Sequence, residues 1–290
     1  MISFAQPARA KHARKSNILK PLLQFSGALI CLSLPPAAHA NEPPKPDTAV
    51  CSIKVNPQAP RDISDIVPGK NSNPVNLAPS PDTMSLCNIH FHRSAEHRST
   101  GFKEASKDGD NTGFVCSIKD ATQPAEPAKD EHGHVSCQSL PAGDTIEVHW
   151  VFTSCPPPEK PYVAGLANCT RCKTDKVAPV LRVEAKVFSL SSNQGEDFAD
   201  YNLAPKGAQP KKLPDGANAV TYLGSTTGPA YDANKACSPL TATWNVRPTC
   251  SPLKIGTLKA WCNDNAYGEK LAHGVRPLVS EPDLLAPIKK

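Results

Sequence analysis

The chain has 290 residues, and its 32 Lys and Arg against 27 Asp and Glu give a formal net charge of +5 and a sequence pI of about 8.6. The excess lies in the first 40 residues, where five basic residues and no acidic one occur, which leaves 27 of each sign in the rest. A nearly neutral remainder lacks the electrostatic attraction that nucleic acids and anionic membrane surfaces require, so we expect no nucleic-acid partner.

The N-terminal segment has the pattern of a secretory signal peptide. Basic residues precede an apolar run at 22–34 and the small-residue sequence Ala38-His39-Ala40. The run is too short to span a bilayer, which takes about 20 residues. We expect cleavage after Ala40, a Pro-rich leader at 41–50, one domain at 51–290, a periplasmic or secreted location, and no membrane insertion after cleavage.

Cysteine usage agrees with export. Of 11 cysteines, Cys31 leaves with the signal, and the even number that remains predicts disulfides in an oxidising compartment. Cys169 and Cys172 form a C-x-x-C pair that fits a redox motif or half of a zinc site, but in an exported chain a structural partner for each thiol is the better interpretation.

The fold class expected is mainly β. The 31 prolines argue against long helices, and apolar-polar alternation predicts short strands joined by loops. The strands are expected at residues 87–92, 145–152, 180–190, 219–222 and 241–246, and the main loops at 103–111, 122–133, 155–160 and 194–215.

Two of these strands carry histidines. Because side chains alternate along a strand, His90 and His92 project from the same face about 6.6 Å apart. On the strand at 145–152, His149 shares a face with Glu147. If the two strands are neighbours, three imidazoles can hold a metal ion with one position open to water, and Glu147 can accept the remaining ring N–H of a ligand.

Two other interpretations stay open at this point. The histidines can be ordinary exposed or hydrogen-bonded residues, and His97 can replace His149 as the third ligand.

The sequence L-C-N-I-H-F-H-R-S-A-E-H resembles the signature of delta-class carbonic anhydrases and, more distantly, of the alpha class. The segments E-V-H at 147–149, Y-L-G-S-T-T-G-P at 222–229 and T-A-T-W-N-V at 241–246 are similar to alpha-class motifs and follow in the same order. The resemblance extends from about residue 51 to 280 and implies an alpha-carbonic-anhydrase-like central sheet.

By this resemblance the chain is a zinc lyase that reversibly hydrates carbon dioxide to bicarbonate through a metal-bound hydroxide. His90, His92 and His149 would bind Zn²⁺, although cobalt or cadmium suits the same ligands. The other residues implied are Thr226, which would accept a hydrogen bond from the hydroxide and donate its own to an ionised Glu96, Thr227, which would help to hold bicarbonate, and Val151 and Trp244, which would line the carbon dioxide pocket.

The resemblance also implies a disulfide between Cys51 and Cys237. The sequence differs from the alpha pattern in having Arg93 where tryptophan is usual and in lacking an early proton-shuttling histidine. His97, His132 and His134 are candidates for that task.

Two functions of other classes compete with the enzyme. A carbonic-anhydrase-like binding protein would keep the fold without turnover, and an extracytoplasmic metal-sequestering protein would hold more than one ion per chain. The sequence leaves the oligomeric state open.

Overall fold

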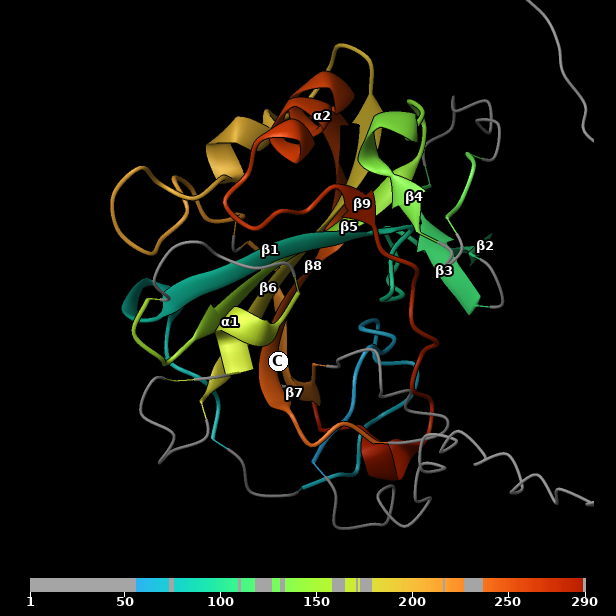
Figure 1. Cartoon of the computed structure of the whole chain (residues 1–290). Coiled ribbons are helices and arrows are strands. Elements are labelled where there is room, and N and C mark those ends of the chain that lie inside the picture. The colour runs from blue at the N-terminus through green and yellow to red at the C-terminus, as the bar shows by residue number, and fades with distance from the viewer. Residues whose placement is uncertain are drawn as a thin grey trace, which may run out of the picture. The chain divides into compact units, whose positions relative to one another are not determined.

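A five-stranded mixed sheet forms the centre of the fold in this computed structural model (Figure 1). The residues described are 56–72, 76–108, 111–117, 127–130, 134–157, 165–170, 172, 179–215, 217–226 and 237–288. The predicted signal peptide and leader, and also Cys51, Thr227 and His132, lie outside them.

The sheet has the strand order β1-β5-β6-β8-β7, and only the β6–β8 pair is parallel. This architecture confirms the prediction of a mainly β protein with a central sheet and short helices. The strands are β1 (Ser85–Arg93), β5 (Thr145–Thr153), β6 (Leu181–Ser191), β8 (Thr241–Lys254) and β7 (Val220–Ser225).

Both faces of the sheet are buried, and alternation along each strand decides which side chain enters which core. In β5, Val148 and Trp150 belong to a core that also contains Phe188 and Phe198, whereas Val151 points to the opposite core with Trp244. Since strand side chains alternate, the histidine at position 149 lies on the Val151 side.

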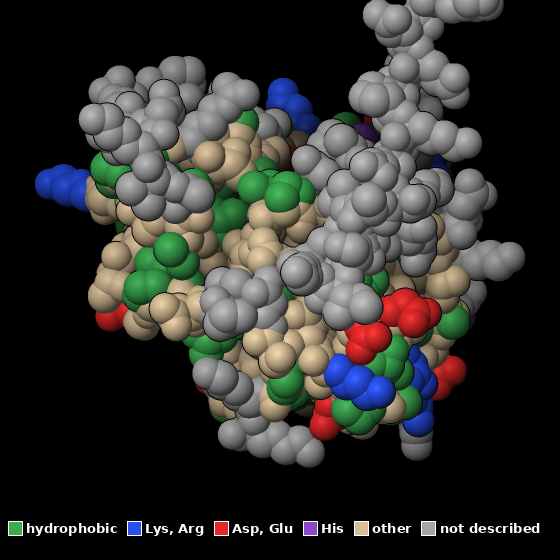
Figure 2. All heavy atoms as spheres, turned by 90° about the horizontal axis from the view of Figure 1, so that it is seen from below, with side chains coloured by type: hydrophobic (Ala, Val, Ile, Leu, Met, Phe, Trp, Pro, Cys, Tyr) green, Lys and Arg blue, Asp and Glu red, His purple; other side chains and the backbone are tan. Residues whose placement is uncertain are grey.

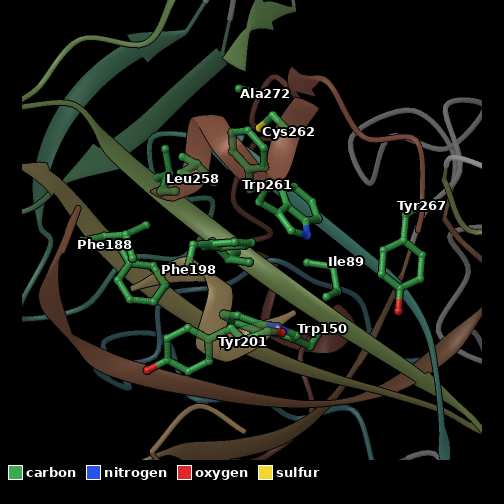
Figure 3. Packing of buried hydrophobic residues seen from close by; sticks show 14 of the residues in the cluster. Ile89, Trp150, Phe188, Phe198, Tyr201, Leu258, Trp261, Cys262, Tyr267 and Ala272 are labelled. Carbon is green, nitrogen blue, oxygen red and sulfur yellow. The ribbon is translucent and has the colours of Figure 1, made fainter. Parts of the chain in front are cut away.

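Aromatic residues fill the core that contains Val148 and Trp150 (Figure 3). Trp261 of helix α2 (Ile255–Asn263) lies with its ring centroid 4.8 Å from that of Phe198 and 6.4 Å from that of Phe91 in β1. Trp150 donates its indole N–H to the backbone oxygen of Tyr201 at 3.1 Å, so the buried nitrogen keeps a partner. This packing holds α2 against one side of the sheet (Figure 1).

Strand β8 is longer than the sequence predicts and contains Pro248 and Pro252. Strand β7 pairs with β8 only as far as Val246, and the β6–β8 register shifts between Ala185 and Val187. The prolines therefore occur where β8 has lost one neighbour, which is where a strand tolerates a missing N–H.

One loop prediction is wrong. Residues 103–111 were expected as a loop, but they contain β2 (Glu104–Asp108), which pairs antiparallel with β3 (Asn111–Val115). The hairpin lies outside the main sheet and is rich in polar residues, so it shows no apolar alternation. The remaining elements are β4 (Val135–Ser136), β9 (Leu271–Ala272), α1 (Ala167–Thr170), and the 3-10 turns Pro81–Thr83, Cys137–Ser139, Phe198–Tyr201 and Pro282–Leu284.

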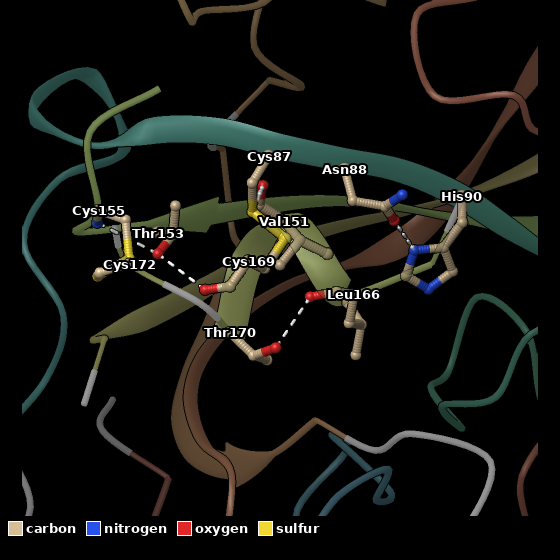
Figure 4. Close-up of a disulfide and its surroundings, with 10 residues drawn as sticks. All are labelled: Cys87, Asn88, His90, Val151, Thr153, Cys155, Leu166, Cys169, Thr170 and Cys172. Carbon is tan, nitrogen blue, oxygen red and sulfur yellow. Dashed lines mark hydrogen bonds between the residues drawn. A yellow bond between two sulfur atoms is a disulfide. The ribbon is translucent and has the colours of Figure 1, made fainter. Parts of the chain in front are cut away.

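Four disulfides lie among the described residues, as expected for an oxidising, extracytoplasmic compartment. Cys169 and Cys172 bond to two different partners, Cys87 and Cys155, which agrees with the structural interpretation of the C-x-x-C pair (Figure 4). Cys237 is also disulfide-bonded, while the partner predicted for it, Cys51, lies outside the described residues. The other two disulfides are Cys116–Cys250 and Cys137–Cys262.

The surface carries mixed charge on the face shown in Figure 2, where basic and acidic side chains lie beside one another and hydrophobic side chains are dispersed. The exposed large hydrophobic residues among those described are Ile66 and Val180. A helix long and apolar enough to cross a membrane is not found in the described part of the chain.

Candidate metal centre

His90 of β1 and His149 of β5 are direct partners across the antiparallel pair. Opposite residues on one face of such a pair have Cβ atoms about 4.5–5.5 Å apart, which brings the two rings together. Their centroids lie 5.0 Å apart, and Nδ1 of His149 is 3.2 Å from Nε2 of His90.

His92 completes a group of three imidazoles. It projects from the same face of β1 as His90, and its ring centroid is 5.3 Å from that of His90 and 4.9 Å from that of His149. One ring nitrogen from each histidine lies within 4.8 Å of the others, so the group could hold a metal ion.

The other nitrogen of each ring has an oxygen partner. His90 Nδ1 is 2.6 Å from Oδ1 of Asn88, His92 Nδ1 is 2.9 Å from the backbone oxygen of Gly274, and His149 Nε2 is 3.0 Å from Oε1 of Glu147. Each of these oxygens is an acceptor, so each ring donates there. The lone pairs of Nε2 of His90, Nε2 of His92 and Nδ1 of His149 are thereby available to a metal.

A β-bulge sets this arrangement. The β1–β5 register shifts between Leu86 and Asn88, so Cys87 is the extra residue. Cys87 can then enter the same core as the histidines and bond to Cys169, while Asn88 shares a face with His90 (Figure 4). Nδ2 of Asn88 is buried and has no hydrogen-bond partner among the residues that the structure describes.

Burial keeps the imidazoles of His90 and His92 neutral. Desolvation, together with the charges that neighbouring histidines would carry, lowers the pKa of His92 to about 3 and holds the pKa of His90 well below its usual range. A metal binds the neutral form of imidazole, so these two rings do not have to lose protons at neutral pH.

Glu147 collects four hydrogen bonds on its carboxylate. Besides His149, it accepts from Nδ1 of His97 at 2.6 Å and from the backbone N–H groups of Glu96 and His97 at 2.7 and 3.1 Å. Burial alone would raise the pKa of Glu147, but the electrostatic effect of His97 and these hydrogen bonds hold it well below its usual range. The carboxylate is therefore ionised.

His97 lies in a second group, with Glu147 and His149, whose donor atoms also come within 4.8 Å of one another. Both of its ring nitrogens are occupied, Nδ1 by Glu147 and Nε2 by the hydroxyl of Tyr222 at 2.7 Å. It is fully buried. This geometry suits a structural histidine better than a metal ligand.

Glu96, the predicted hydrogen-bond acceptor, is buried and paired with Arg276. Its carboxylate accepts hydrogen bonds from the backbone N, Nε and Nη2 of Arg276 at 2.9, 2.9 and 2.8 Å. Burial raises the pKa of Glu96, but the adjacent guanidinium more than offsets this and holds the pKa well below its usual range. Glu96 is ionised.

Thr226 is buried near the end of β7. Its backbone N–H donates to Leu240 at 2.9 Å, and its carbonyl accepts from the Ser238 hydroxyl at 2.5 Å. Within the described residues its hydroxyl makes no hydrogen bond to Glu96. Thr227 lies outside them.

Both residues predicted to line the substrate pocket are buried in the core on the histidine side of the sheet. The Trp244 ring centroid lies 5.0 Å from that of His149. Val151 is two residues after His149 and on the same face of β5. Each also packs as an ordinary core residue.

Sequence reasoning missed four neighbours of this centre: Asn88, His273, Gly274 and Arg276. Asn88 had a usable signal, because it precedes His90 by two residues on the same face. The other three approach from more than 170 positions away, through the backbone bridge between His92 and His273. A local pattern does not reveal such a contact.

The fold and centre thus define a mainly β protein with a buried three-histidine group that could hold a metal. A family model described as delta carbonic anhydrase matches residues 81–257, more than half of the chain. The chain belongs to the delta carbonic anhydrase family. A search of curated proteins finds no match.

Two solved structures are similar over most of their length. One is the alpha-carbonic anhydrase of Thermovibrio ammonificans in complex with the inhibitor sulfanilamide, at 13% identity over 81% of this chain and 87% of that chain, with a TM-score of 0.29. The other is Photobacterium profundum alpha-carbonic anhydrase, at 15% identity over 84% and 93%, with a TM-score of 0.26. At these TM-scores they add no weight to the assignment, which comes from the family model.

Proposed function

We propose that the chain catalyses the zinc-dependent, reversible hydration of carbon dioxide to bicarbonate. One observation carries the proposal: His90, His92 and His149 each offer a ring nitrogen within 4.8 Å of the other two, and each ring also has a nitrogen held by an oxygen acceptor. Three nitrogen ligands leave a fourth tetrahedral position open, as in catalytic zinc sites.

The donor set fits zinc, because neutral imidazoles are among its preferred ligands. Zinc bound in this way lowers the pKa of water from 15.7 to about 7 and so supplies hydroxide at neutral pH. Cobalt or cadmium would fit the same nitrogens, and metal analysis has to choose between them.

The protein's own groups would orient the reaction. Ionised Glu96 can accept a hydrogen bond, and Arg276 fixes its carboxylate in place. We assign Thr226 the role of donating its hydroxyl proton toward Glu96, and Thr227 that of helping to hold bicarbonate. The apolar side chains of Val151 and Trp244 would receive carbon dioxide, which has no net dipole.

Glu147 is proposed as the group that orients His149. It accepts from Nε2, so Nδ1 stays free for the metal, and its negative charge raises the basicity of the ring.

A periplasmic or secreted location is part of the proposal. The four disulfides support an oxidising compartment. The signal peptide at 1–40, the catalytic domain at 51–290 and the Cys51–Cys237 bond stay predictions.

Stopped-flow measurement of carbon dioxide hydration tests the proposal. Activity should be lost on chelation and restored by stoichiometric zinc, and Thr226→Val should lower it with the metal still bound. Hydration no faster than the buffer rate in zinc-loaded protein would contradict the proposal. That result would leave a carbonic-anhydrase-like binding protein or a metal-sequestering protein as the function.

A further inference from the structure

A second pair of histidines lies beside the three-histidine group. His134 directly precedes β4 and His273 directly follows β9. These strands pair antiparallel with Val135 opposite Ala272, so the register continues to place His134 opposite His273. Their ring centroids lie 5.4 Å apart.

Each of these histidines has a carboxylate four residues earlier in the chain. Nδ1 of His134 is 3.4 Å from Oδ2 of Asp130, and Nε2 of His273 is 3.1 Å from Oε2 of Glu269. Two further hydrogen bonds join Asp130 to His134, from the Asp130 N–H to the His134 carbonyl and from the His134 N–H to Asp130 Oδ1, both at 2.8 Å.

We propose that His134 and His273, with Asp130 or Glu269, form an accessory site for a divalent transition metal, with Cu²⁺ as the ion that it binds most tightly. Two imidazoles and a carboxylate are suitable ligands for copper and zinc, and copper exceeds zinc in affinity for most such donor sets. The 5.4 Å ring spacing is close to the 4.9–5.3 Å within the three-histidine group.

The two sites differ in how closely their donor atoms are already arranged for a metal before it binds. The His134 and His273 side chains are 30% and 34% exposed, whereas the three-histidine group is mostly buried. The accessory donors do not all lie within 4.8 Å of one another, so binding has to rotate the partly exposed histidine side chains into place. The accessory site therefore binds its ion more weakly and exchanges it faster.

The accessory site borders the first one. The ring centroid of His273 lies 5.6 Å from that of His90 and 5.8 Å from that of His92. The backbone of His273 also bonds to Phe91 and Arg93 on either side of His92. The inference concerns binding alone and does not depend on hydration activity. The accessory histidines are also distinct from the three proposed zinc ligands.

Equilibrium dialysis of the zinc-loaded protein against Cu²⁺ tests the site, with copper and zinc both counted and nitrogen coordination read from electron paramagnetic resonance. We expect one copper per chain to bind without release of zinc. His134→Ala and His273→Ala should each weaken copper binding at least tenfold while zinc content stays at one. Asp130→Asn should weaken it less.

Lys270→Ala is the matched control, since Lys270 is an exposed residue next to Glu269 and should leave copper binding unchanged. His134 is the decisive position because its partly exposed side chain makes misfolding of the variant a small risk. Copper that binds only by displacing zinc, or that binds equally well in His134→Ala, would overturn the proposal. If His149→Ala fails to hold zinc yet still binds copper, the two sites are separate, whatever the hydration activity.

Discussion

Oε1 of Glu147 lies 3.0 Å from Nε2 of His149, two residues further along β5. Glu147→Gln keeps the size of the side chain but removes the charge, and its amide can no longer accept four hydrogen bonds. Loss of such an outer partner typically costs about 10–100-fold in metal affinity. We expect a loss in this range, measured by zinc competition with a chromophoric chelator.

Glu184→Gln is the control for this variant. Glu184 is also buried, lies opposite Trp150 on the neighbouring strand β6, and pairs with Arg247. Its replacement should lower stability without changing zinc affinity. Equal loss of affinity in both variants would show that Glu147 acts only through the stability of the fold.

The Arg276–Glu96 pair should contribute strongly to stability. Arg276→Ala leaves a buried carboxylate without its guanidinium, and breaking a buried pair in this way costs about 3–5 kcal/mol. Urea unfolding of the metal-free protein measures the change. Arg98→Ala serves as comparison, because the Arg98–Asp62 pair is more exposed and should contribute only about 0–1 kcal/mol. Similar losses for both arginines would contradict the importance of burial.

Acid should destabilise the metal-free protein over a defined range. Burial lowers the pKa of His92 to about 3 and also lowers that of His90, whereas an unfolded histidine has a pKa of about 6.5. Between pH 6.5 and 3 these two histidines bind protons in the unfolded state but stay unprotonated in the folded state. The free energy of unfolding should therefore decrease as the pH is lowered across this window, by up to about 1.4 kcal/mol per pH unit for each histidine.

Chemical unfolding at pH 7.5, 6 and 5 in the presence of chelator measures this slope. His92→Asn removes one titrating group and should flatten it. A metal-free protein as stable at pH 5 as at pH 7.5 would show that these two rings are protonated in the fold.

The disulfides should differ in their contributions. Cys87 and Cys169 are separated by 82 positions, and Cys155 and Cys172 by 17. On chain entropy alone the longer loop stabilises by about 1.4 kcal/mol more. Replacing each pair by alanine should give a larger loss of unfolding free energy for Cys87–Cys169. The reverse order would mean that contacts in the native state outweigh loop entropy.

Alternation along β1 and β5 was enough to predict where the histidines point. A period of two places His90 and His92 on one face and joins Glu147 to His149, whatever the neighbouring strands are. The pairing of β1 with β5 was a premise rather than a deduction, since it depends on the register of strands 50 residues apart. The structure provides it by placing His90 opposite His149.

Other features had no local signal. The hairpin of β2 and β3 consists mostly of polar residues with a single buried aromatic, Phe114, so periodicity could not separate it from a loop. Arg276 reaches Glu96 across 180 positions, and His273 meets His134 only because β4 and β9 pair. Such contacts depend on where distant segments of the chain pack against one another. The composition of these short segments does not determine that position.

The central claim is that three imidazoles, from positions 90, 92 and 149, hold one divalent metal ion. Metal content per chain, measured by mass spectrometry after dialysis against a weak chelator that strips exposed sites, tests it most directly. We expect one zinc in the unaltered protein, one in His97→Ala, and less than a tenth in His149→Ala. Zinc retained by His149→Ala but lost from His97→Ala would contradict the account and move the metal to the neighbouring group.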